Sequence, residues 1–267
     1  PSFVSVEGGK LRRPAAEALE LPALPDPVLP AIEGTHNLVI TGVGGTGVVT
    51  IGAVLAQAAQ IDGKGAGMME MAGLAQKGGA VHIHLRLANR PEDISAIRVA
   101  VGEADCIIGG DLVVTAGART IGLMTSGRTG AVVNDHEIIT GEFTRNRDFR
   151  VPADRLKMSL QARLGERTAF FDASQLAERL LGDSIYSNML VMGAAFQQGL
   201  IPLSEAAILK AVELNGAKVA ENQRAFQIGR WAVLNPDKLA APAEPTTLPR
   251  DPVAYRAARL VDYQSEG

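Results

Sequence analysis

The chain has 267 residues, of which 46% are hydrophobic and 21% charged, enough for one sizeable domain with a hydrophobic core. Its formal net charge of -3 argues against a general nucleic-acid binder, because phosphate contacts need a basic surface. No apolar run reaches the roughly 20 residues of a membrane span, and the chain has no secretory start, so we expect a cytoplasmic protein.

Prolines mark the expected boundaries, because a proline removes a backbone donor and disfavours helix and sheet interiors. They are dense before residue 36 and after residue 235 and sparse between. We therefore expect an extended connector over residues 1–35, a folded body over 36–234, and a proline-rich extension or linker over 235–267. The chain starts with Pro1 rather than Met, so we expect it to be processed or cut from a longer protein.

Within the body, short apolar runs alternate with helical patterns. The expected strands are residues 37–41, 78–87, 105–110, 130–135 and 168–173. The expected helices are one starting near Thr46, then residues 112–124, 174–181, 185–198, 203–215 and 217–231. This order predicts an α/β fold with a Rossmann-like, mostly parallel sheet, helices on both faces and a helical C-terminal part. The stretch "GMMEMAG" is a poor strand candidate, because it has no β-branched residue.

The first functional candidate is the loop "TGVGGTG", with the spacing Gly42-x-Gly44-x-x-Gly47 between a strand and a helix. The first backbone N–H groups of a helix are unpaired, its dipole favours negative charge, and glycines let the backbone approach a phosphate closely. We therefore predict an anion site here. A tight turn needed only for packing is the alternative.

Dinucleotide binding is a narrower alternative for the same loop. It requires an acidic residue about 20 positions further on to hold the ribose. Glu70 is near enough in sequence, although the stretch around it is the poor strand candidate described above. The glycine spacing alone does not separate a nicotinamide cofactor from another anion.

A second candidate is the stretch "LAQKGGAVHIHLRLA", where a turn carrying Lys77 leads into a strand. Because side chains alternate along a strand, His82, His84 and Arg86 point to one side, as a stripe suited to phosphate or carboxylate recognition. The stripe also has two other interpretations: a half-solvated face, or part of a metal site completed by Cys106 and His136.

Three stretches in this order, "GVGGTGVVTIGAVLAQAA", "AQKGGAVHIHLRLA" and "ELNGAKVAENQRAFQIGR", resemble the gamma-type domain of the 2-oxoacid:ferredoxin oxidoreductases. The chain is most similar to the indolepyruvate ferredoxin oxidoreductases of the long fused bacterial form. The likeness covers about residues 1–231. It implies oxidative decarboxylation of a 2-oxoacid, with thiamine diphosphate, iron–sulfur clusters and coenzyme A.

The chain departs from a complete enzyme, because it lacks the thiamine signature and has a single cysteine where a cluster needs about four. The resemblance therefore implies an accessory domain that is inactive alone. Thiamine diphosphate, magnesium and iron–sulfur clusters would belong to partner domains or subunits, with ferredoxin as a further partner and an oligomer as the expected assembly. This chain would shape the active site and help to hold coenzyme A. The predicted ligand-binding residues are Gly42, Gly44, Gly45, Thr46, Gly47, Gln76, Lys77, Gly78, Gly79, His84 and Arg86.

Overall fold

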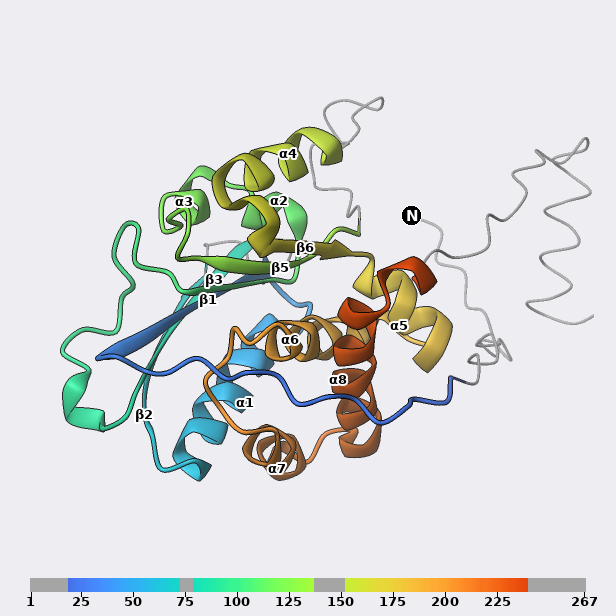
Figure 1. Ribbon diagram of the computed structural model, residues 1–267, viewed down its shortest axis with the longest axis horizontal. Helices are drawn as coiled ribbons and strands as arrows, with labels where there is room; N and C mark the ends of the chain where they lie inside the picture. The colour runs from blue at the N-terminus through green and yellow to red at the C-terminus, as the bar shows by residue number, and fades with distance from the viewer. Residues whose placement is uncertain (1–18, 73–78, 137–151, 240–267) are drawn as a thin grey trace, which may run out of the picture.

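The computed structural model describes residues 19–72, 79–136 and 152–239, and it contains a six-stranded sheet with helices on both faces (Figure 1). The strands lie in the order β2-β3-β1-β4-β5-β6. Strands β1, β4, β5 and β6 run parallel, whereas β3 is antiparallel to both β1 and β2. Their bounds are Thr35–Val43 (β1), Gly65–Ala72 (β2), Ala80–Ala88 (β3), Cys106–Gly109 (β4), Gly130–Asn134 (β5) and Thr168–Phe171 (β6).

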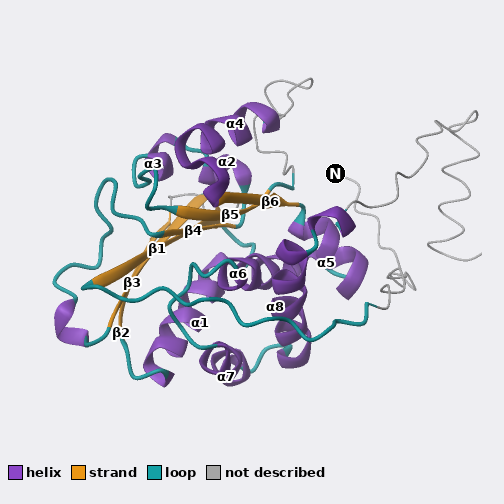
Figure 2. Ribbon diagram, in the orientation of Figure 1, coloured by secondary structure: helices purple, strands orange, loops and turns teal. Residues whose placement is uncertain are grey.

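The helices form two layers, one on each face of the sheet (Figure 2). The thicker layer contains α1 (Val48–Ile61), α5 (Ala173–Leu181), α6 (Ser187–Gln197), α7 (Glu205–Asn215) and α8 (Val219–Leu234). The thinner layer contains α2 (Leu112–Thr115), α3 (Ala118–Ile121) and α4 (Ala153–Leu164). None of the described helices is both long and apolar enough to span a membrane.

The predicted α/β class, with a mostly parallel sheet, is confirmed, and each expected strand corresponds to an observed one. Three local expectations were wrong. The methionine-rich stretch dismissed as a strand forms β2, an edge strand whose pairing with β3 outweighs its weak strand propensity. The single helix expected over residues 112–124 is two short helices separated at Gly117, and α4 was not predicted.

The segment before β1 has no helix or strand in its described part, as expected for an extended connector, yet it packs on the body. Leu21, Leu24 and Ile32 contact the core of the thicker layer. Arg230 of α8 donates a hydrogen bond to the Pro25 carbonyl at 3.1 Å. The segment is therefore held along the helical layer, and a domain boundary at residue 35 stays a prediction.

Helix α6 is the centre of the thicker layer and is buried on nearly all sides, which explains why it is apolar all round. It crosses α8 at two glycines. A methyl group at Gly193 would lie 2.0 Å from the Phe226 carbonyl oxygen, and one at Gly229 would lie 1.9 Å from the Leu190 carbonyl oxygen. The two backbones can approach this closely only because both positions lack a side chain.

We expect Gly193→Ala to lower the free energy of unfolding by about 3 kcal/mol, because the added methyl group must push the two helix backbones apart. Chemical denaturation monitored by circular dichroism measures the change. Ala220→Ser, at an exposed position of α8, serves as the control and should change stability by less than about 0.5 kcal/mol. Equal stabilities for the two variants would contradict the close crossing.

Candidate functional site

The glycine loop connects β1, which ends at Val43, to α1, which begins at Val48. Gly45 and Gly47 have left-handed backbone conformations, with φ of 91° and 86°. Between them, the Thr46 hydroxyl donates a hydrogen bond to the Val43 carbonyl at 2.7 Å. The turn from strand to helix therefore lies where the glycine spacing predicted it, with α1 beginning two residues later than expected.

Several backbone N–H groups of this turn make no hydrogen bond with the described residues and can donate to a ligand. Gly47 is the N-cap of α1, and no side chain caps the helix there. The Thr50 N–H donates to the Gly47 carbonyl at 3.0 Å. Among the described residues, no hydrogen bond uses the N–H of Gly45, Gly47, Val48 or Val49. Such an unpaired, solvent-facing helix start is suited to bind an anion.

The other two glycines of the motif, Gly42 and Gly44, are explained by packing and hydrogen bonding within the protein. A methyl group at Gly42 would lie 2.3 Å from Cγ2 of Val48, so this glycine lets the helix pack onto the strand. The Gly44 N–H donates a hydrogen bond to the Gly79 carbonyl at 2.7 Å, which joins the two glycine motifs. The remaining predicted residues of the second motif, Gln76, Lys77 and Gly78, lie outside the described residues.

A cavity of about 480 Å³ opens in front of the loop, at the carboxyl ends of the parallel strands. The chain leaves β1 towards β2 and β3 on one side, and β4 lies on the other, so the cavity occupies the topological switch point of the sheet. Open α/β sheets bind their ligands in this crevice. Residues from five parts of the chain line it, among them Thr46, Asp111, Asn134, His136, Ser174, Ile185 and Asn188.

Two buried asparagines hold the walls of this cavity together. Asn134, at the end of β5, donates to Ser174 Oγ at 3.0 Å and accepts from the Ala173 N–H at 3.0 Å, which fixes the start of α5. Asn188 of α6 donates from Nδ2 to the Thr46 carbonyl and so anchors the glycine loop. The cavity therefore has a preformed polar floor.

At the mouth of the cavity, His136 lies beside Asp172, with 3.0 Å between Nδ1 and Oδ2. The carboxylate also caps α5 by accepting from the Gln175 N–H at 2.7 Å. Because the carboxylate orients the ring through Nδ1, the other ring nitrogen is left to meet a ligand.

A second cavity of about 190 Å³ adjoins the first and shares Gly47, Ile185 and Asn188 with it. Its far end is lined by Lys218 and Asn222 from the start of α8. The two cavities therefore meet at Gly47, the N-cap of α1. Two cavities that meet at a helix start can take a longer ligand than a small ion.

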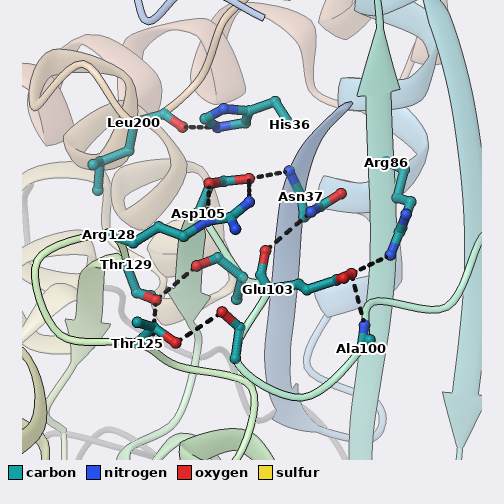
Figure 3. Close-up of polar contacts among 12 residues, drawn as sticks. His36, Asn37, Arg86, Ala100, Glu103, Asp105, Thr125, Arg128, Thr129 and Leu200 are labelled. Carbon is teal, nitrogen blue, oxygen red and sulfur yellow. Dashed lines mark hydrogen bonds and ion pairs between the residues drawn. The ribbon is translucent and has the colours of Figure 1, made fainter. Parts of the chain in front are cut away.

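The structure does not place His84 and Arg86 among the residues that line this cavity. Arg86 is paired with Asn37 near the start of β1, six residues, or about 20 Å, from the end of that strand. Its guanidinium forms an ion pair with Glu103 at 2.7 Å, in a polar network at the amino-terminal ends of the parallel strands (the amino edge of the sheet; Figure 3). The side-chain alternation was predicted correctly, but it could not show which end of the strand faces the loop.

The histidines of the same strand are buried, so the half-solvated interpretation is also wrong. His82 lies against Thr120 of α3, with 3.2 Å between Nε2 and Oγ1. His84 Nδ1 accepts a hydrogen bond from the Val99 N–H at 2.9 Å. Burial, helped by the nearby His82 and arginine charges, lowers the pKa of His84 to about 4, so this ring is neutral at pH 7.

The structure does not bring the proposed metal ligands together either. Cys106 packs in the core of the thicker layer, whereas His82 and His84 face the thinner layer. Burial raises the pKa of the Cys106 thiol well above its ordinary value, which disfavours the thiolate that binds metals. Within the described ranges, no three His, Cys, Asp or Glu side chains form a group able to hold a metal ion.

The structure does not place the acidic residue that dinucleotide binding requires beside the glycine loop. Glu70 lies on β2, opposite Ile83 of β3, and β3 separates β2 from β1. In dinucleotide-binding folds the acid that holds the ribose sits on the strand next to the glycine loop. The structure therefore does not bring Glu70 to the loop.

The cavity residues that the sequence analysis missed include Asp111, Asn134, Ser174 and Asn188. Asp111 follows β4 and Asn134 is the last residue of β5. Both strands were predicted, and polar residues at the carboxyl ends of parallel strands are a usable signal. Ser174 and Asn188 lie in the first turns of helices and carry no comparable local signal. Only the packing of α5 and α6 beside the loop brings them to the cavity.

Comparison with known proteins gives one matching family. Residues 37–232 match the family "Pyruvate ferredoxin/flavodoxin oxidoreductase". The indolepyruvate oxidoreductase subunit IorB of Thermococcus kodakarensis is 29% identical over 197 residues, which cover 73% of this chain and 94% of that protein. The IorB subunit of Archaeoglobus fulgidus is 27% identical over 72% of this chain and 92% of its own.

Solved structures share the fold. The gamma subunit of a keto/oxoacid ferredoxin oxidoreductase from Geobacter sulfurreducens superposes with a TM-score of 0.52 at 22% identity, covering 74% of this chain and 98% of that one. A 2-oxoglutarate:ferredoxin oxidoreductase from Magnetococcus marinus, solved with 2-oxoglutarate, coenzyme A and succinyl-CoA, gives a TM-score of 0.53 at 17% identity. Here the match covers 80% of this chain but 33% of the longer one.

The buried state of His84 predicts a pH dependence of stability. Its pKa of about 4 in the folded protein lies below the ordinary 6.5, so the unfolded chain binds more protons between these values and stability falls as the pH drops. We expect His84 to account for a loss of about 2 kcal/mol between pH 7 and pH 5. His84→Asn keeps an acceptor for the Val99 N–H but does not titrate, so urea unfolding should show a smaller difference between the two pH values. An unchanged difference would contradict the assignment.

Proposed function

Because the chain belongs to the pyruvate ferredoxin/flavodoxin oxidoreductase family, we propose that it is the gamma-type accessory part of an enzyme that oxidises an aryl 2-oxoacid. The relatives named as indolepyruvate oxidoreductase subunits support indolepyruvate or another aryl pyruvate as the substrate. The overall reaction is decarboxylation of the 2-oxoacid, transfer of the acyl group to coenzyme A, and transfer of two electrons to ferredoxin.

In this proposal the cofactors of the redox chemistry belong to partner domains or subunits. Thiamine diphosphate supplies the carbanion chemistry and iron–sulfur clusters carry the electrons. The residues of this chain do not fit a cluster, since the single cysteine, Cys106, is fully buried in β4. The contribution of this chain is therefore to dock beside the thiamine site, shape its mouth and bind coenzyme A.

The observation that carries the coenzyme A role is the unpaired start of α1 at the open cavity. Phosphate oxygens accept hydrogen bonds, and the N–H groups of Gly45, Gly47, Val48 and Val49 are free to donate them. The helix dipole adds a favourable field at this end. No cationic side chain is needed for this recognition, which is why the loss of Arg86 from the site leaves the proposal intact.

The presence of two adjoining cavities supports coenzyme A over a small anion. Coenzyme A has a diphosphate between an adenosine and a long flexible arm. The two adjoining cavities extend to either side of Gly47, and Ile185, 66% exposed, supplies an apolar surface along the way. The diphosphate would lie at the loop while the two arms follow the cavities.

The test of this function is reconstitution with a thiamine-bearing partner subunit. The chain alone should not reduce a ferredoxin or viologen dye with indolepyruvate and coenzyme A, whereas the complex should. A chain that oxidises an aryl pyruvate unaided would overturn the accessory role. Replacing indolepyruvate by pyruvate or 2-oxoglutarate tests the substrate class, and a preference for either would contradict an aryl substrate.

The same complex tests the loop with a matched pair of variants. Gly45 is exposed and has no neighbour within 4 Å of an added Cβ. Its φ of 91° strains any side chain, but this strain is common to Asn and Asp and cancels when the two variants are compared. Gly45→Asp places a negative charge at the phosphate position and should raise the KM for coenzyme A at least about tenfold. Gly45→Asn, of the same size but neutral, should stay within a few-fold of the wild type. Equal KM values for the two variants would remove the loop from coenzyme A binding.

A further inference from the structure

Asp111 is a buried carboxyl group on the wall of the main cavity. It follows the glycine end of β4, is 1% exposed, and caps α2 by accepting a hydrogen bond at Oδ1 from the Val114 N–H at 2.8 Å. Its other oxygen, Oδ2, is buried and makes no hydrogen bond with any residue in the described part of the chain. Oδ2 is therefore an acceptor without a donor among the described residues.

The helix cap does not explain the second oxygen. Asp172 also caps a helix, and its carboxylate in addition holds His136, with 3.0 Å between Oδ2 and Nδ1. In Asp111, burial raises the pKa of the carboxyl group, while the N–H groups of Val114 and Val113 partly oppose this shift. A buried acceptor without a donor costs free energy, so its retention beside a cavity points to a donor brought by a ligand.

Asp111 also lies next to the open helix start. A methyl group at Gly110, the preceding residue, would lie 3.4 Å from Val48 Cγ2 in the first turn of α1 and 3.0 Å from Asn188 Oδ1. Gly110, Asp111 and the glycine loop therefore line one cavity. A ligand that pairs with both the helix start and Asp111 must carry a phosphate and a hydroxyl or amino donor.

We propose that Asp111 is a specificity-determining residue that accepts a hydrogen bond from the sugar or base of a nucleoside diphosphate whose phosphates lie on the glycine loop. This inference rests on the proposed function and assigns the adenosine diphosphate part of coenzyme A to the main cavity. Free phosphate and diphosphate have neither a sugar nor a base, so when they lie on the glycine loop they bring no such donor to Asp111. The carboxyl group thus favours nucleotides over free phosphate and diphosphate.

The experiment is isothermal titration of the full chain with coenzyme A, ADP and inorganic pyrophosphate. Asp111→Asn keeps the cap oxygen and replaces the free acceptor by a donor, so it should weaken coenzyme A and ADP at least about tenfold and leave pyrophosphate unchanged or slightly tighter. Asp62→Asn, at the opposite end of α1, removes the same charge and should change none of the three affinities. If Asp111→Asn does not fold, Asp111→Ser keeps the cap without a second acceptor and should give the same selective loss.

The outcomes separate this inference from the proposed function. Unchanged affinities for coenzyme A and ADP in the Asp111 variants, together with a loss in Gly45→Asp, would overturn the inference and leave the coenzyme A role in place. Equal weakening of all three ligands would also overturn it, because Asp111 would then act only by shaping the loop. No binding of coenzyme A by the wild-type chain would overturn both the inference and the coenzyme A role.

Discussion

The site depends on one backbone constraint, the passage from β1 to α1 through two left-handed glycines. Gly45 and Gly47 adopt the left-handed conformations that the turn requires, and Gly42 lets α1 pack closely on β1. With glycine at the N-cap, no side chain satisfies the first N–H groups of α1. Residues with side chains at these positions would strain the turn or fill the space that a ligand needs.

Polar groups lie at both ends of the parallel strands, and their surroundings differ. At the amino edge, Asp105 accepts from the Asn37 N–H at 2.8 Å and from Arg128 Nε at 2.7 Å, and Thr129 and Thr125 bond to the neighbouring carbonyls (Figure 3). At the carboxyl edge, the first N–H groups of α1 and the second oxygen of Asp111 have no partner among the described residues. The network at the amino ends holds the fold, although Asn37 Oδ1 and Arg86 Nε within it are buried without a partner among the described residues. The groups at the carboxyl ends differ because they belong to residues that line an open cavity or lie beside it, where a ligand can bind.

Local patterns in the sequence predicted the fold well. The apolar runs of β1, β4 and β5 and the alternation in β3 required no tertiary information, and the three-helix tail followed its own periodicity. The edge strand β2 was missed because its residues, such as Met68 and Met69, have weak strand propensity and gain their conformation by pairing with β3. The break at Gly117 and the existence of α4 likewise depend on packing against the thinner layer.

The site was predicted only in part, for physical reasons that can be named. Glycine spacing located the open helix start, because that geometry is set within six residues of the chain. The face occupied by His84 and Arg86 was correct, but period-2 alternation does not give the strand direction or what covers that face. Asn188 comes from a helix more than a hundred residues away and reaches Thr46 only in the folded chain.

The most direct measurement is an amide NMR titration of the isotope-labelled chain with coenzyme A. If the open helix start binds the diphosphate, the largest shifts should occur at the N–H resonances of Gly45, Gly47, Val48 and Val49, with those of Arg86 and its amino-edge neighbours unchanged. Shifts confined to other surfaces, or none at saturating ligand, would show that this helix start is only a turn.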